Sequence, residues 1–189
     1  MKSNFSATFG AILISAISFT SCNSNDAVKQ ADAANTQSPE MVSANKVNSD
    51  DAQFLTSTLS GGMMEVELGK LCATQTKNSA VQDFGAMMIQ DHTAADNEMT
   101  TIAANKNIMV PAVMSNNDQA MVDDMRKKSG SDFDKAYINM MIHGHMGAIN
   151  DFKKESSSGK DADISSFASR TLPTLQKHLD AANAALKAI

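Results

Sequence analysis

The sequence is poor in the residues that cross-link or interrupt small folds. Its 189 residues include no tryptophan, one tyrosine, three prolines and two cysteines. Two cysteines are too few for a scaffold held together by several disulfides. Acidic residues outnumber basic ones by 21 to 16 and no basic run exceeds three residues, so we expect no nucleic-acid partner.

Motifs for common catalytic chemistry are also missing. The sequence has no Cys-x-x-Cys pair, no glycine-rich phosphate loop and no recognisable nucleophile–base pair. The adjacent Gly61 and Gly62 fit close helix packing better than a phosphate cradle. These absences argue against hydrolase and nucleotide chemistry, and we do not expect an enzyme.

Only the N-terminus carries a long apolar run. Phe9 to Phe19 is too short to span a bilayer as a helix, follows the basic Lys2, and leads into small residues before Cys22. This form predicts a lipoprotein signal peptide over 1–21, with a lipid on Cys22 as the membrane contact. We expect a periplasmic, lipid-anchored protein; Asn23 favours the outer membrane. An ordinary secretory signal is the alternative.

The mature chain divides into a tether and one domain. Residues 22–48 are rich in Asn, Ser and Ala and poor in large apolar residues, which predicts a flexible tether. Residues 49–189 carry helical apolar periodicity and no persistent strand pattern. They predict an all-α domain with four long helices at about 50–77, 80–105, 132–155 and 163–187.

The second and third of these helices are joined by a long connection. Residues 106–131 contain Pro111 and a short predicted helix at about 118–128. The first and second long helices are joined tightly, as are the third and fourth, so each pair is antiparallel. A connection long enough to run the length of the bundle predicts the crossover topology of a ferritin-like four-helix bundle.

Each long helix places one ionisable residue on its apolar face: Glu65, His92, His145 and His178. Counted from the turns, Glu65 and His92 lie within roughly 2 Å of one level, and the other two within about 4.5 Å, at 1.5 Å per residue. Buried ionisable groups must be paired, hydrogen-bonded or ligated. The pattern predicts one transition metal ion (Zn, Mn, Fe or Cu) held by these four residues.

Other interpretations of this cluster remain open. A hydrogen-bonded network that only fixes helix register explains the same residues. A ferritin-like oxidase is a third possibility, but Ile89 and Leu175 occupy the positions where a di-iron site needs Glu-x-x-His. His143 lies off the apolar stripe and is expected at the surface, while Cys72 lies on a stripe and is expected as a buried thiol.

Four segments resemble a known family: EVELGKL (65–71), QDH (90–92), FDKAYINMMIHGH (133–145) and LPTLQKHL (172–179). They resemble domain-of-unknown-function family 4142, exported bacterial proteins often labelled as outer membrane proteins and grouped with ferritin-like bundles. The resemblance covers about 50–188 and implies fold and export, but no activity. The matching positions are Glu65, Asp91, His92, Tyr137, His145, Pro173 and His178.

Three further residues are expected to support the ligands. Asp91 and Asp96 flank His92 and are candidate acceptors for its ring N–H, and Tyr137 is a matching position of the family. Segment 133–152 also resembles a second exported helical family with the motif MMIxHHxxAI, for which metal binding is suspected. This chain departs from that motif by having Gly144 between His143 and His145.

Overall fold

The computed structural model describes residues 26–37 and 47–189, and every regular element in these ranges is a helix. The prediction of an all-α bundle is therefore confirmed. The helices are α1 (Ala27–Gln37), α2 (Ser49–Gln75), α3 (Ser79–Asn105), α4 (Asn116–Arg126), α5 (Gly130–Ser158) and α6 (Ala162–Leu186).

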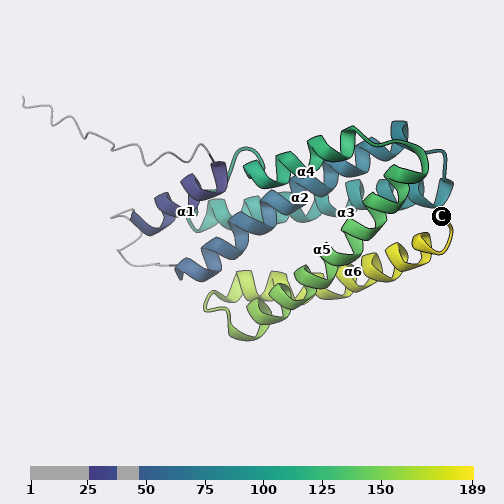
Figure 1. The fold of residues 1–189 in the computed structure, drawn as a ribbon. Helices are drawn as coiled ribbons and strands as arrows, with labels where there is room; N and C mark the ends of the chain where they lie inside the picture. Colours follow the sequence, from purple (N-terminus) through teal and green to yellow (C-terminus); the bar gives the residue numbers. More distant parts are fainter. Residues whose placement is uncertain (1–25, 38–46) are drawn as a thin grey trace, which may run out of the picture.

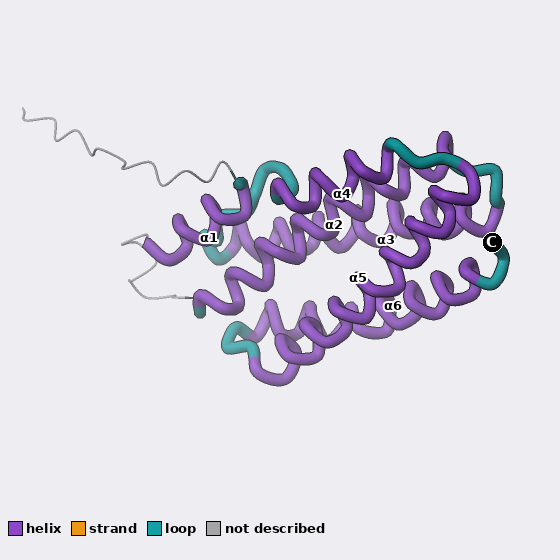
Figure 2. Tube along the Cα trace, in the orientation of Figure 1, coloured by secondary structure: helices purple, strands orange, loops and turns teal. Residues whose placement is uncertain are grey.

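The four long helices form two hairpins that lie side by side. Helix α2 packs along α3, and α5 packs along α6, with a tight turn inside each pair. Between the hairpins, α4 carries the chain back along α2, so that α5 starts near the end of the bundle where α3 starts (Figure 1). The predicted crossover with a short helix is present, and in the described ranges the loops lie toward the two ends of the bundle (Figure 2).

Side-chain caps define where several helices begin. The carboxamide of Asn48 accepts the backbone N–H of Asp50 at the start of α2, and Asn78 accepts those of Ala80 and Val81 at the start of α3. These caps satisfy donors that have no partner within a helix.

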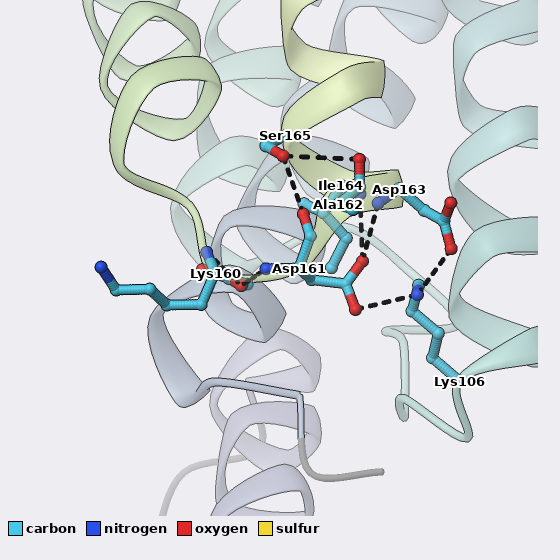
Figure 3. A network of polar contacts seen from close by, with 8 residues as sticks. Lys106, Lys160, Asp161, Ala162, Asp163, Ile164 and Ser165 are labelled. Carbon is cyan, nitrogen blue, oxygen red and sulfur yellow. Dashed lines mark hydrogen bonds and ion pairs between the residues drawn. The ribbon is translucent and has the colours of Figure 1, made fainter.

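The turn between α5 and α6 is tied to the end of α3 (Figure 3). Asp161 accepts the backbone N–H groups of Asp163 and Ile164 and so caps α6. Lys106, just after α3, places its Nζ 2.8 Å from Asp161 Oδ2 and 2.7 Å from Asp163 Oδ2. The network holds the second hairpin against the first at this end of the bundle.

The apolar core consists of two clusters along the bundle. One contains Leu59, Met99, Ile149 and Leu175, and the other contains Leu68, Met88, Met141 and Ala182. On every long helix the ionisable residue of the apolar face lies in sequence between members of the two clusters. A polar layer therefore separates two apolar layers.

The structure corrects the prediction of a flexible tether over 22–48, because part of that segment is helix α1. Asn35 donates to the carbonyl of Met109 at 2.9 Å and accepts the N–H of Met109 at 2.7 Å. Asp26 accepts the N–H of Asn116, and Ala31 is buried. Polar contacts and one small apolar residue hold α1 in place, so its lack of large apolar residues was misleading.

The predicted signal peptide, Cys22 and the tether residues 23–25 and 38–46 lie outside the described residues. Within the described ranges, no helix is both long and apolar enough to cross a membrane.

Candidate metal centre

Three histidines from three helices meet in the polar layer. His92 of α3, His145 of α5 and His178 of α6 are buried, and one ring nitrogen from each lies within 4.8 Å of the other two. Their ring centroids are 5.2 to 5.8 Å apart. The axial offset expected between His145 and His178 is spanned by the side chains, because their nearest nitrogens are only 3.2 Å apart.

The outer nitrogens of two of these rings have fixed acceptors. Nδ1 of His145 lies 2.8 Å from the carbonyl oxygen of Met141, and Nε2 of His178 lies 2.9 Å from Oδ2 of Asp91. Burial raises the pKa of Asp91, but its hydrogen bond with His178 and the charges of His178 and Lys177 lower the pKa overall. Carbonyl and carboxylate oxygens only accept, so both outer nitrogens carry the proton.

The inner nitrogens of the same two rings therefore face each other as acceptors. His145 Nε2 and His178 Nδ1 are 3.2 Å apart, and each carries a lone pair when its ring is neutral. A second proton on either ring would relieve the repulsion. However, burial lowers the pKa of both histidines, which disfavours that proton. A cation between the two nitrogens satisfies both lone pairs.

Glu65 brings a carboxylate from α2 to the same layer. Its Oε2 lies 3.1 Å from Nε2 of His92, although the two are not aligned as a hydrogen bond, and its Oε1 lies 3.7 Å from Nδ1 of His145. The structure thus brings together all four sequence-predicted ligands.

The electrostatics keep the three histidines neutral near pH 7 and leave Glu65 about half protonated. Burial raises the pKa of Glu65 to about 7, partly offset by the nearby His145. Burial lowers the pKa of His92 to about 4, partly offset by Asp91. Both shifts have the same cause, since a low-dielectric surrounding disfavours the charged form of acid and base alike.

Asp91 and Asp96 do not have the partner that the sequence suggested. Both flank His92 in the chain, but Asp91 accepts its hydrogen bond from His178, as shown above. Asp96 lies against Gly62 of α2, where an added Cβ would overlap its carboxyl group, and its Oδ1 is buried without a partner. Burial, and then the charge of Glu65, raise the pKa of Asp96 to about 7.

Tyr137 makes no hydrogen bond to the four ligand residues, although burial, the Cys72 thiol and then the charge of Glu65 raise the pKa of its hydroxyl. Its ring stacks on Phe133 and meets Phe84 edge-on within the second apolar cluster. Its hydroxyl is buried beside the Cys72 thiol and forms no hydrogen bond. Tyr137 therefore donates no hydrogen bond that would orient a histidine.

The remaining two residues behave as the sequence suggested. Cys72 is a buried free thiol whose pKa burial raises to about 12, so it is not a reactive thiolate. His143 is exposed, and its Nδ1 lies 2.7 Å from the carbonyl oxygen of Asn139 one turn earlier.

A groove of about 750 Å³ leads from this cluster along the bundle, a feature that sequence reasoning missed. Glu65, His92 and His178 line one end, and exposed residues such as Gln53 and His143 line it where it reaches solvent. Its walls contain small residues that leave the space open, namely Gly61, Gly144, Gly147, Ala95 and Ala148. Small residues on facing helices are the sequence feature from which the groove could have been predicted.

Comparisons with known proteins place this helical domain in a family without an assigned activity. No curated protein and no solved structure matches the sequence. The match to a family covers residues 36–185, so it begins earlier than the expected 50–188 and includes the last residues of α1. The chain therefore belongs to the family DUF4142, a domain of unknown function.

Proposed function

We propose that this protein binds a single transition metal ion through Glu65, His92, His145 and His178. The observation that supports this most strongly is the pair of facing acceptor nitrogens of His145 and His178, 3.2 Å apart. Two ligands held about 2.1 Å from a tetrahedral ion lie roughly 3.4 Å from each other. Nitrogen atoms at that spacing need little movement to share an ion.

The contacts behind the rings support the same proposal. A metal-binding histidine usually donates its other N–H to a carboxylate or a backbone carbonyl, which fixes its tautomer and orientation. Asp91 has that role for His178, and the Met141 carbonyl has it for His145. Imidazole nitrogens with one carboxylate oxygen suit Zn, Mn, Fe or Cu.

Metal uptake should release a proton. Glu65 has a pKa of about 7 in the buried site, so a large part of it is protonated at neutral pH. A carboxyl group must be deprotonated to ligate, and metal affinity should therefore fall as the pH drops below about 7. The bound ion would act as a local positive charge that stabilises the Glu65 carboxylate.

The test is metal titration of protein purified without a histidine tag. We expect the wild type to bind one equivalent of metal and the His92→Ala/His145→Ala variant to bind none. His143→Ala is the matched control, because it removes an exposed histidine two residues from His145 and should leave binding intact. Negligible uptake by the wild type would refute the proposal, whether or not the double variant folds.

A second candidate function rests on the hydrogen bonds of the cluster. His145 and His178 have acceptors even without an ion, as a network that only fixes helix register would require. In that case the protein is a structural or interaction bundle in the envelope. Its melting temperature would then be indifferent both to EDTA and to added Zn, Mn, Fe or Cu.

We further propose that the chain is exported and anchored by a lipid on Cys22, facing the periplasm and preferably at the outer membrane. The support is the sequence pattern before Cys22. A Cys22→Ser variant should move from the membrane fraction to the soluble periplasm. Equal amounts of both proteins in the soluble fraction would show that the signal is an ordinary secretory one.

A further inference from the structure

The groove ends, away from the histidines, at a second group of ionisable side chains. Asp51 from the first turn of α2 and Glu155 from the last turn of α5 both line it there, together with Gly159 and Lys160 of the following turn. Along α2, the 14 residues from Asp51 to Glu65 separate the two ends by roughly 21 Å at 1.5 Å per residue. The two ends are thus distinct places.

Glu155 is the exceptional member of this second group. Glu155 is only 8% exposed, and its Oε1 is buried without a hydrogen-bond partner. Gly159 makes room for it, because an added Cβ there would overlap the Glu155 carboxyl group. A buried acceptor without a partner costs free energy unless something fills the site.

Asp51 nearby has a structural role already. Its Oδ2 accepts the backbone N–H groups of Lys160 at 2.9 Å and Asp161 at 2.6 Å, which ties α2 to the α5–α6 turn. It is only 2% exposed, and its negative charge lies close enough to act on Glu155. Asp51 therefore contributes charge, and Glu155 contributes the unpartnered oxygen.

The wider surroundings of Glu155 are acidic. In addition to burial, Asp50 and Asp51 of α2 and Asp161 of the turn raise the pKa of Glu155 through their charges. Lys154, on the same helix as Glu155, lowers it. Burial, and next the charge of Asp51, raise the pKa of Glu155 to about 7. Lys160 also lines the groove and is exposed, and Lys106 is paired with Asp161 and Asp163.

The space beside these carboxyl groups is apolar. Phe54, Phe152 and Phe167 line the groove next to the acidic end, with Phe54 and Phe152 in edge-to-face contact at 4.9 Å between centroids. A volume of about 750 Å³ is within the range of small-molecule sites, which combine apolar walls with a few placed polar groups. The shape suits a molecule with an apolar body and a cationic end.

We propose that the groove binds a hydrophobic amine, with its ammonium group on the Glu155 carboxyl beside Asp51 and its apolar body against Phe54, Phe152 and Phe167. The ammonium group supplies the donors that the buried Glu155 oxygen lacks. An anion would be repelled by the negative charge of Asp51, and a neutral alcohol would gain no charge–charge attraction to it. The proposal does not depend on metal at the histidines.

Binding should be coupled to a proton at Glu155. An alkylammonium has a pKa near that of lysine, about 10.4, and stays charged at neutral pH. Glu155 must lose its own proton to pair with the ammonium group. The affinity for the amine should therefore rise between pH 6 and pH 8.

The experiment is calorimetric titration of the metal-free protein with octylamine, 1-octanol and octanoate below their aggregation limits. We expect octylamine to bind at least tenfold more tightly than the other two, with lower affinity at pH 6 than at pH 8. Glu155→Gln should remove that preference. Asp132→Asn, which removes an exposed carboxylate of the same helix outside the groove, should retain it.

Three outcomes would overturn the proposal. One is equal affinity for the amine, the alcohol and the acid. Another is an unchanged preference in a folded Glu155→Gln protein. The third is binding of calcium, but not octylamine, in a manner that Glu155→Gln abolishes, since that would make the site one for inorganic cations. If Glu155→Gln does not fold, the three wild-type titrations still decide. Because no metal is present, failure here leaves the histidine proposal untouched.

Discussion

Buried acids are the most unusual residues of this bundle. Glu65 and Asp96 lie beside the histidines, and burial raises the pKa of each to about 7. Asp96 reaches its place only because Gly62 has no side chain. Such groups weaken a fold once they ionise, so their presence at the polar layer calls for a compensating role, which the proposed ligation by Glu65 would supply.

Glu65→Gln tests this cost in the metal-free protein. The folded-state pKa of Glu65 is raised from 4.5 to about 7, so the stability due to its neutral form is complete below about pH 4.5 and is lost as the pH rises through 7. The variant should match the wild type near pH 4 and exceed it by about 3 kcal/mol at pH 8. Denaturant unfolding at both pH values measures the difference.

Glu67→Gln is the control, because Glu67 forms a surface ion pair with Lys70. Its effect should stay below about 1 kcal/mol. A Glu65→Gln protein that is less stable than the wild type at pH 8 would mean that a carboxylate at residue 65 is stabilised without metal.

At the scale of helices, glycines set how closely α2 and α3 approach. Gly69 and Gly85 face each other across the pair: an added Cβ on Gly69 would lie 2.7 Å from the carbonyl oxygen of Gly85 and 2.8 Å from Cγ1 of Ile89. By contrast, an added Cβ on Gly147 of α5 would meet nothing within 4 Å. Gly69 is needed for the close packing of α2 against α3, whereas Gly147 leaves the groove open.

Gly69→Ala and Gly147→Ala should therefore change stability in opposite directions. The first forces two backbones apart and should destabilise the protein by about 1–3 kcal/mol. The second adds a better helix former in open space and should stabilise it by about 0.5–1 kcal/mol. Thermal melts of both variants at one pH make the comparison, and equal shifts of the same sign would contradict this account of the packing.

On the scale of the whole molecule, the polar layer lies between two apolar clusters that stabilise the bundle. Ligands from all four long helices would let one ion link both hairpins. Metal that binds only the folded state stabilises it by about 2.7 kcal/mol at a concentration 100 times Kd.

For a domain of this size that stabilisation corresponds to a rise in Tm of roughly 5–10 °C. Calorimetry with one of Zn, Mn, Fe or Cu in excess, and again after EDTA, measures it. The His92→Ala/His145→Ala variant should show no rise, whereas His143→Ala should respond like the wild type. An unchanged wild-type Tm with every metal would favour the structural bundle.

Local patterns in the sequence were enough to predict the helices and the four polar residues of the layer. Apolar spacing, caps and turn residues act within a few positions, so the long helices, the crossover helix and the common level of Glu65, His92, His145 and His178 followed from them. The place of α1 did not, because its hydrogen bonds to Met109 and Asn116 join residues more than 70 positions apart.

Tertiary structure alone decided how the side chains around the layer are used. In the structure Asp91 pairs with His178 instead of His92, Tyr137 packs among aromatic rings, and a groove ends at Glu155. These outcomes depend on the distance and rotation between helices. A periodic pattern states which face of a helix is buried, but not which residue of another helix it meets there.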